Sequence, residues 1–212
     1  MRPTPRVKVC GLRSLENAIA CHEAGAELLG INFFPKSKRF VDFAEARAWL
    51  GDLEGLVERV GLFVNASIEH VRSIARSGLI DTVQLHGDES LDFARQLTDA
   101  GIPLIRAIRV RGLESLRQIR SQHTRRILLD AHSAKGYGGT GETFDWELAR
   151  KAVTDHPDLE IMLSGGLSPA NVADAVKAVR PAAVDVASGV ESAPGIKDPE
   201  LVRTFADHAR SA

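Results

Sequence analysis

The chain has 212 residues, of which 44% are hydrophobic and 26% charged, and these values are typical of a compact domain with its own core. Its 27 basic and 28 acidic residues nearly cancel, which leaves no excess of positive charge for binding a nucleic-acid backbone. The chain has no run near the about 18 apolar residues of a membrane span and no apolar signal-peptide stretch in MRPTPRVKV, so we expect a cytoplasmic protein with no nucleic-acid or membrane partner.

Apolar runs rich in β-branched residues alternate with amphipathic segments along the chain. The apolar runs predict strands at residues 6–10, 27–33, 59–64, 81–86, 103–109, 126–131, 159–163 and 183–187. The amphipathic segments have apolar residues three and four apart and predict helices at residues 14–24, 42–50, 67–77, 89–100, 112–121, 145–153, 168–179 and 198–210. Each predicted strand is followed by one predicted helix.

Residues that favour helix ends support this prediction. Residues able to cap a helix N-terminus precede four of the helices, at Ser14, Ser67, Asp88 and Ser168. Pro169 then suits the first helical position after Ser168. The phrases EAGAELLG, RSGLIDTV and DAGIPLIR each place a glycine where a helix ends and a short step enters the next strand.

This alternation predicts the fold class. Eight strand–helix repeats in 212 residues fit a single closed (β/α)8 TIM barrel with parallel strands, and we expect residues 1–212 to form this one domain. An open doubly wound sheet is the alternative. It usually has fewer strands at this length and often a GxGxxG turn after the first strand, where this chain has CGLRS. In a barrel, the active site lies at the carboxyl ends of the strands.

Polar and small residues gather at those predicted strand ends. They are Cys10 and Gly11, Gln84 to Gly87, Asp130, Gly165 and Gly166, and Ser188 and Gly189. The chain also contains KVCG, FFPKSKR, VGLFVN, VQLHGDE, LLDA followed by GGTG, LSGGL, and DVASGVE followed by PGIKD. With these motifs, in order from residue 8 to residue 198, the chain resembles the phosphoribosylanthranilate isomerases of tryptophan biosynthesis.

The resemblance implies a (β/α)8 barrel that needs no metal or cofactor and acts on a small phosphorylated molecule. The implied reaction is an Amadori rearrangement of the aminoaldose N-(5-phospho-β-D-ribosyl)anthranilate to the aminoketose 1-(2-carboxyphenylamino)-1-deoxy-D-ribulose 5-phosphate. It requires an acid that protonates the ribose ring oxygen and a base that removes the proton from C2′. The resemblance assigns the acid to Asp130 and the base to Cys10.

The local sequence is compatible with both roles. A thiol is a useful base only as thiolate, and nearby positive charge lowers its pKa from about 8.5. The alternative for Cys10 is a small buried hydrophobic residue, which is our interpretation of Cys21; a reducing cytosol would leave both as thiols. Asp130 closes the apolar run ILLD, where desolvation would raise the pKa of its carboxyl, or it caps the loop that follows. We expect the glycine-rich loop at 132–143 to cover the site or to be a surface loop, with His132 a weaker catalytic candidate.

Glycines after the seventh and eighth strands predict where the substrate phosphate binds. Barrels of this kind often hold a phosphate there on backbone N–H groups, and a glycine lets an oxyanion approach the backbone closely. The alternative is that these glycines only make tight turns. The predicted phosphate-binding residues are Gly165, Gly166, Ser188 and Gly189.

Four further residues are predicted to bind the rest of the substrate. Arg39 matches the family position that holds the anthranilate carboxylate, and its planar fork suits a carboxylate; a surface arginine is the alternative. Gln84 and His86 are expected to line the same end of the barrel, with a structural hydrogen bond as the alternative for His86. Asp185 would polarise the substrate or orient polar neighbours, or else make a structural hydrogen bond.

Two other functions remain as alternatives. A related barrel enzyme of histidine or tryptophan biosynthesis would act on another phosphosugar amine, but such enzymes usually pair two aspartates as acid and base. A catalytically silent barrel could keep the phosphate site, but it would have little reason to retain both Cys10 and Asp130. We expect a monomer or a homodimer.

Overall fold

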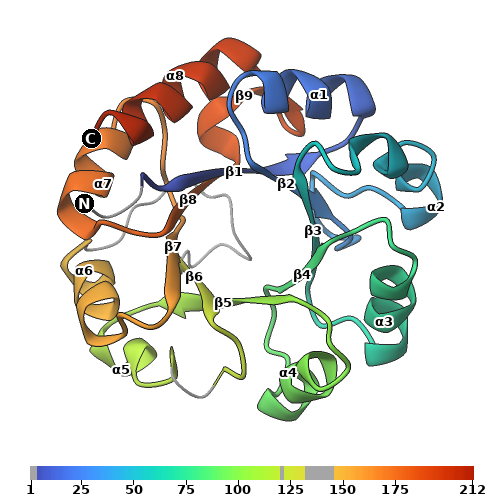
Figure 1. Cartoon of the computed structure of the whole chain (residues 1–212), viewed down its shortest axis with the longest axis horizontal. Coiled ribbons are helices and arrows are strands. Elements are labelled where there is room, and N and C mark those ends of the chain that lie inside the picture. Colours follow the sequence, from blue (N-terminus) through green and yellow to red (C-terminus); the bar gives the residue numbers. More distant parts are fainter. Residues whose placement is uncertain (1–3, 120–121, 132–145) are drawn as a thin grey trace.

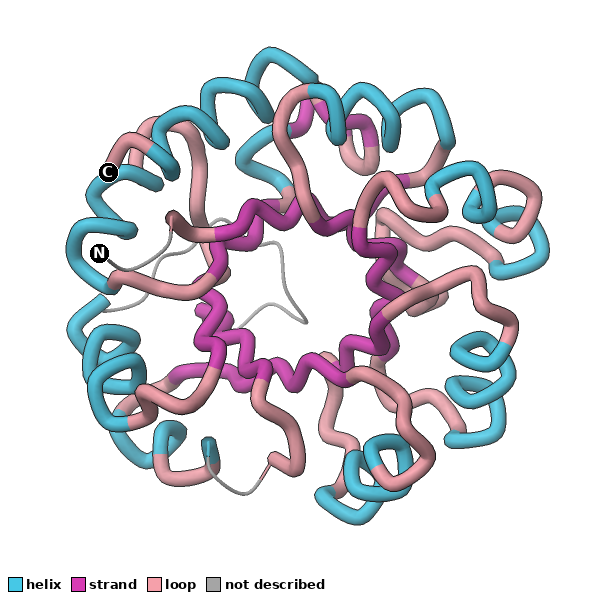
Figure 2. The backbone as a smooth tube through the Cα atoms, in the orientation of Figure 1, coloured by secondary structure: helices cyan, strands magenta, loops and turns pink. Residues whose placement is uncertain are grey.

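The computed structural model describes residues 4–119, 122–131 and 146–212, and in these residues parallel strands close into a barrel surrounded by helices (Figure 1). The barrel strands are β1 (Arg6–Leu12), β2 (Leu28–Asn32), β3 (Glu58–Phe63), β4 (Thr82–Leu85), β5 (Leu104–Val110), β6 (Arg126–Ala131), β7 (Glu160–Leu163) and β8 (Ala183–Val186). Each strand pairs with the next, and β8 pairs with β1 to close the ring drawn in magenta in Figure 2. The predicted (β/α)8 barrel is confirmed, and the open sheet is excluded.

Helices connect the strands on the outside of the barrel. They are α1 (Leu15–Glu23), α2 (Phe43–Ala46), α3 (Ile68–Arg76), α4 (Leu91–Thr98), α5 (Leu113–Leu116), α6 (Trp146–Asp155), α7 (Val172–Val179) and α8 (Pro199–Arg210). Two short 3₁₀ helices, η1 (Leu50–Leu53) and η3 (Ser188–Val190), and a hairpin of β9 (Glu191–Ala193) and β10 (Ile196–Lys197) complete the described elements. In the described part of the chain, no helix is long and apolar enough to cross a membrane.

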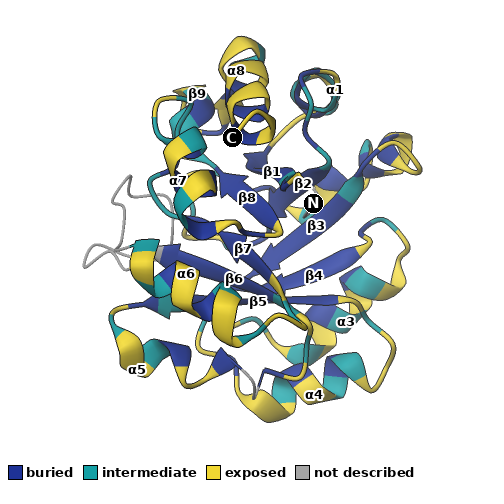
Figure 3. Ribbon diagram, turned by 60° about the vertical axis from the view of Figure 1, so that its left-hand side comes forward, coloured by how far each residue is buried: buried dark blue, intermediate teal, exposed yellow. Residues whose placement is uncertain are grey.

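Side chains of each barrel strand alternate between the interior and the helix-facing outside. In β1, Val7 and Val9 pack outward in the main core, so Lys8 and Cys10 face inward. An apolar layer fills the middle of the interior, formed by Leu28, Val60, Ile105, Ala107, Leu128, Met162 and Ala183. Figure 3 shows the strands in the dark blue of buried residues and the outer faces of the helices in yellow.

A charged cluster closes the interior at the amino ends of the strands. Glu58 accepts hydrogen bonds from Arg126 Nη1 at 2.5 Å, Thr82 Oγ1 at 2.7 Å and Arg6 Nη2 at 2.9 Å. Burial alone would raise the pKa of Glu58, but its bonds to Arg126 and Thr82 lower that pKa below its ordinary value. The apolar layer separates this cluster from the polar residues at the carboxyl ends of the strands.

Local signals predicted several helix ends correctly. Ser14 and Ser67 accept hydrogen bonds from backbone N–H groups of the first turns of α1 and α3, as N-caps do. The predicted stop glycines Gly25, Gly78 and Gly101 all have positive φ, between 74° and 108°, which only glycine adopts without strain.

Two predicted N-caps are wrong. Helix α4 is capped by Ser90 rather than Asp88, because Glu89 between them is buried and its carboxylate accepts bonds from Arg106 and two backbone N–H groups. Helix α7 begins at Val172 rather than after Ser168. Asn171 holds the intervening turn, since its Oδ1 accepts from the Ser168 N–H and its Nδ2 donates to the Gly166 carbonyl.

Two predicted helices are also shorter than expected. Residues 42–50 form only the single turn α2 before the chain passes into η1, in which Leu50 and Leu53 are fully buried. Residues three apart eclipse in a 3₁₀ helix, so this conformation buries both leucines on one side. Within predicted helix 112–121, α5 covers Leu113–Leu116, and residues 120–121 lie outside the described part of the chain.

Candidate active site

Cys10 lies on the interior face of β1 near its carboxyl end. The strand continues to Leu12, so Cys10 is not its last residue as predicted, but the pairing with β2 shifts register at Gly11, whose φ is +93°. A side chain at Gly11 would collide with Arg39 Cδ, and a Cβ on Gly30 of β2 would lie 2.7 Å from Cys10 Sγ. These two glycines therefore make the space in which Cys10 and Arg39 lie.

The surroundings of Cys10 act on its pKa in opposite directions. The residue is 7% exposed and packs with Leu62 and Val64. Burial raises the pKa of the thiol above its ordinary value, and the Asp185 carboxylate raises it as well. The positive charge of Lys8 lowers this pKa, and the charge of Lys197 lowers it by a smaller amount. Nearby cations therefore lower the pKa of Cys10 as expected, but burial has the larger effect and the pKa is raised overall.

Lys8 was not among the predicted site residues. It is fully buried one layer below Cys10, and its Nζ donates to Asp185 Oδ1 at 2.7 Å. Asp185 Oδ2 accepts from Ser164 Oγ at 2.9 Å, so both carboxylate oxygens are bonded. The sequence did contain a signal: a lysine inside an apolar strand, two residues before Cys10, must share its face of the strand.

Asp130, His86 and Gln84 form a buried chain of hydrogen bonds. Asp130 Oδ2 lies 3.1 Å from His86 Nε2, and His86 Nδ1 lies 2.9 Å from Gln84 Nε2. The three residues face inward from β6 and from the end of β4, and each is at most 7% exposed. The structure therefore gives His86 a specific partner, the predicted acid. The loop at 132–143 and His132 lie outside the described residues.

Arg39 is held in a second ionic network. Its Nε and Nη2 donate to the two carboxylate oxygens of Glu191 at 2.6 and 2.7 Å, and Lys197 Nζ donates to Glu191 Oε1 at 2.7 Å. The Arg39 side chain is 15% exposed, so it is not a surface arginine. Its bond to Glu191 raises the pKa of Arg39 above its ordinary value. Sequence analysis missed Glu191 and Lys197, although both lie in the motifs DVASGVE and PGIKD.

The two glycine-containing loops after β7 and β8 lie against each other. Gly165 and Gly166 have φ of 89° and 64°, so the turn after β7 requires glycine or a residue that tolerates the left-handed region. A side chain on Gly189 would collide with the Leu167 carbonyl oxygen. The structure thus places the loop that contains Gly165 and Gly166 against the loop that contains Ser188 and Gly189. The positive φ values of Gly165 and Gly166 also fit the alternative that these glycines only make tight turns.

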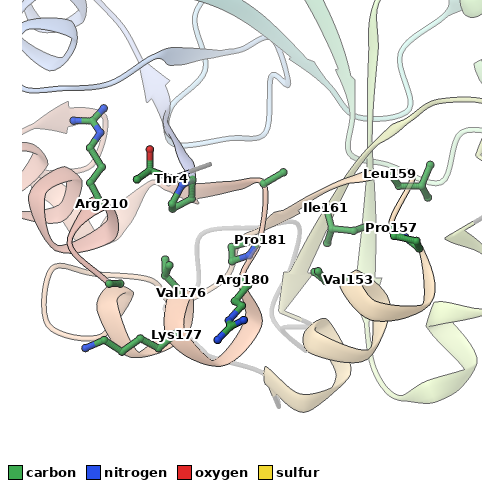
Figure 4. A pocket seen from close by; sticks show the side chains of 13 residues that line it. Thr4, Val153, Pro157, Leu159, Ile161, Val176, Lys177, Arg180, Pro181 and Arg210 are labelled. Carbon is green, nitrogen blue, oxygen red and sulfur yellow. The ribbon is translucent and has the colours of Figure 1, made fainter. Parts of the chain in front are cut away.

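Two cavities of similar size lie at opposite ends of the barrel. One of about 550 Å³ lies between α6, α7 and the chain entering β1, with Ile161, Lys177 and Arg180 in its wall (Figure 4). Another of about 580 Å³ lies beside the ends of β4 and β5 and includes His86 and Arg109. The predicted site residues lie at the second end, and none of them lines the first cavity. Within the described ranges, no three His, Cys, Asp or Glu side chains are grouped as a metal site requires.

The chain is similar over nearly its whole length to known proteins of one family. The family model for N-(5'phosphoribosyl)anthranilate (PRA) isomerase matches residues 7–208. The N-(5'-phosphoribosyl)anthranilate isomerase of Trichlorobacter lovleyi is 45% identical over 207 residues, covering 98% of both chains. The crystal structure of phosphoribosyl anthranilate isomerase from Thermotoga maritima has a TM-score of 0.88 and 38% identity, over 98% of this chain and 100% of its own.

A further solved phosphoribosyl anthranilate isomerase is in complex with reduced 1-(o-carboxyphenylamino)-1-deoxyribulose 5-phosphate. It has a TM-score of 0.85 and 36% identity, and the match covers 98% of this chain and 100% of that one. The resemblance first indicated by short motifs therefore extends over nearly the whole sequence and the whole barrel. The chain belongs to the N-(5'-phosphoribosyl)anthranilate isomerase family, and it is an isomerase of tryptophan biosynthesis.

Proposed function

We propose that this barrel, acting in the cytoplasm as a single domain, converts N-(5-phospho-β-D-ribosyl)anthranilate to 1-(2-carboxyphenylamino)-1-deoxy-D-ribulose 5-phosphate, with Cys10 as general base and Asp130 as general acid. The observation that carries the proposal is that both groups face inward at the same end of one barrel, at most 7% exposed. The relative solved with the reduced product analogue supports the substrate class.

The reaction divides into two proton transfers. Asp130 gives a proton to the ribose ring oxygen, the C1′–O bond breaks, and the nitrogen lone pair forms the C=N bond of a Schiff base. Cys10 thiolate then removes the C2′ proton, and the electrons of that C–H bond form the C1′=C2′ bond of an enolamine while the iminium nitrogen becomes neutral. Tautomerisation of the enolamine gives the aminoketose.

The hydrogen-bonded chain supports the acid role of Asp130. His86 lies 3.1 Å from Asp130 Oδ2 and is itself held by Gln84, so the carboxyl group has a defined orientation. A proton donor must be held in position to act within the lifetime of the bound substrate. Gln84 and His86 would therefore orient the acid as well as line the substrate site.

Arg39 would bind the anthranilate carboxylate while Glu191 holds it in place. The fork with Glu191 uses Nε and Nη2, so a substrate carboxylate would approach end-on, toward Nη1 and the second hydrogen of Nη2. Lys197, bonded to the same Glu191, balances its charge. The arginine is thus pre-positioned before substrate arrives, which lowers the entropy cost of binding.

We expect Arg39→Ala to raise KM about tenfold to a hundredfold for the carboxylated substrate, because a hydrogen bond to a charged group contributes about 1.5–3 kcal/mol. Steady-state kinetics with the substrate and with an analogue lacking the anthranilate carboxylate measures this effect, and the analogue should lose far less. Lys38→Ala removes the adjacent, exposed cation and serves as the control. Equal losses for both compounds would remove Arg39 from this role.

The phosphate would lie on the backbone N–H groups of the paired loops after β7 and β8. We expect Gly166→Asp to raise KM at least about tenfold compared with Gly166→Asn, because only the aspartate places a negative charge beside the phosphate. Both residues tolerate the positive φ of this position better than most, so the pair differs chiefly in charge. An equal KM for the two variants would place the phosphate elsewhere.

A turnover assay with freshly made phosphoribosylanthranilate, following the loss of its fluorescence, tests the proposed function directly. The aminoaldose of histidine biosynthesis is assayed beside it, since activity on that compound would indicate the alternative of a related barrel enzyme that acts on another phosphosugar amine. A flat trace with folded protein would contradict the assignment and favour the silent barrel. Sedimentation of the same sample distinguishes monomer from homodimer.

A further inference from the structure

Lys8 is a buried cation in the barrel interior that none of the proposed substrate contacts uses. Its side chain is fully buried, and its Nζ donates to Asp185 Oδ1 at 2.7 Å. A lysine in such a place is costly unless it is paired, and breaking a buried pair by removing one partner costs more than the pair contributes. A neutral leucine or methionine would fill this interior position without that cost.

Its position relative to Cys10 suggests why the cation is there. Residues 8 and 10 alternate with the outward-facing Val7 and Val9, so the ammonium lies one layer below the thiol on the same wall. Asp185, held from its other side by Ser164, fixes the ammonium in this layer. The pair is therefore a fixed charge arrangement directly beneath the proposed base.

The other charged groups that face Cys10 come from three further elements. Asp185 on β8 opposes thiolate formation, while Lys197 on β10 favours it more weakly than Lys8 does. Arg39, after β2, also interacts with the thiol, but its fork is held by Glu191. Among these cations, Lys8 has the largest effect on the thiol, and burial acts against all of them.

We propose that Lys8 is a positioning residue for the isomerisation, whose buried ammonium, held by Asp185, stabilises the thiolate of Cys10 that removes the C2′ proton. This inference rests on the proposed role of Cys10 as the base. Lys8 keeps its proton throughout: the C2′–H bond breaks, the S–H bond forms, and the ammonium only balances the charge on sulfur. Without this cation, only the weaker effect of Lys197 would oppose burial and the Asp185 carboxylate.

The ionisation of Cys10 can be measured without turnover. Iodoacetamide alkylates the thiolate, and mass spectrometry of the peptide that contains Cys10 gives the rate of alkylation at each pH. The second thiol is removed by Cys21→Ala in all variants. We expect Lys8→Met to be alkylated about tenfold more slowly at pH 7, because loss of an adjacent cation raises a thiol pKa and reduces its thiolate fraction. Asp185→Asn should be alkylated faster, because it removes a negative charge beside the thiol. If the substitutions acted only by reducing access to the thiol, both variants would instead be alkylated more slowly.

The double variant Lys8→Met/Asp185→Asn removes both buried charges and keeps the comparison possible if Lys8→Met alone does not fold. It should be alkylated more slowly than Asp185→Asn. Unchanged alkylation on removal of Lys8 in both backgrounds would overturn the proposal, as would slower alkylation with an unchanged kcat. In the supporting outcome, kcat also falls about tenfold at pH 7 with little change in KM. An active Cys10→Ser enzyme would instead refute the base itself, which separates the two failures.

Discussion

Replacing Cys10 with serine is expected to lower kcat by about 10²–10⁴, which corresponds to roughly 3–5 kcal/mol of activation free energy. The hydroxyl has nearly the shape of the thiol and fits the space that Gly30 leaves open, but it does not ionise near neutral pH. KM and the melting temperature should change much less, because Cys10 is assigned to proton transfer and not to ground-state binding. Steady-state kinetics and thermal unfolding of the same sample measure both.

Cys21 provides a matched control. It is fully buried in α1, where it packs in the core outside the barrel interior and away from the proposed site, and burial raises its pKa to about 12. Cys21→Ser should leave turnover within a few-fold of the unmodified enzyme whatever it does to stability, and Cys10→Ala should resemble Cys10→Ser. A Cys10→Ser enzyme with near-normal kcat would show that Cys10 is a packing residue.

Asp130→Asn is expected to cause a loss of kcat of the same size, about 10²–10⁴, because the amide cannot give a proton to the ribose ring oxygen. The substitution is nearly isosteric, and the amide oxygen can still accept a hydrogen bond from His86. Folding and KM should therefore be little affected. The measurement is kcat and KM from full progress curves, with circular dichroism to verify the fold.

Asp88→Asn is the control for this change, since Asp88 is exposed in the loop after β4 and lies outside the proposed machinery. It should leave kcat within about twofold. If Asp130→Asn keeps normal turnover, the carboxyl group is a structural partner of His86, and the acid must be sought elsewhere.

The order and type of the barrel elements were predictable because they depend on local periodicity. Side chains repeat every two residues in a strand and every 3.6 in a helix, and glycine alone adopts the positive φ that ends several helices without strain. The starts of helices were less predictable where a residue near the start is bound to a distant part of the fold. Glu89 forms a buried ion pair with Arg106, so the N-cap of α4 is Ser90, two residues later than the predicted Asp88. No local pattern in the sequence Asp88-Glu89-Ser90 distinguishes these two positions.

Several candidate site residues, catalytic and substrate-binding, were also predictable from the sequence. Cys10, Gln84 and Asp130 each lie near the carboxyl end of a predicted strand, and the family motifs assigned their roles. Their joint placement followed once the barrel was predicted, because strand ends of a parallel barrel meet at one rim. The partners Lys8, Glu191 and Lys197 did not follow from that argument, since nothing local marks which carboxylate each cation will meet.

What the sequence by itself determined is therefore the alternation of strands and helices, the barrel they build and the candidate residues at the carboxyl ends of its strands. The tertiary structure alone decided the electrostatics of that end. Lys8 meets Asp185 across 177 residues of chain, and Arg39 meets Glu191 across 152, only because β8 closes on β1. Burial, which raises the pKa of Cys10, and the cations that oppose it both arise from that closure, because desolvation and Coulomb energy depend on distances in space and not on sequence.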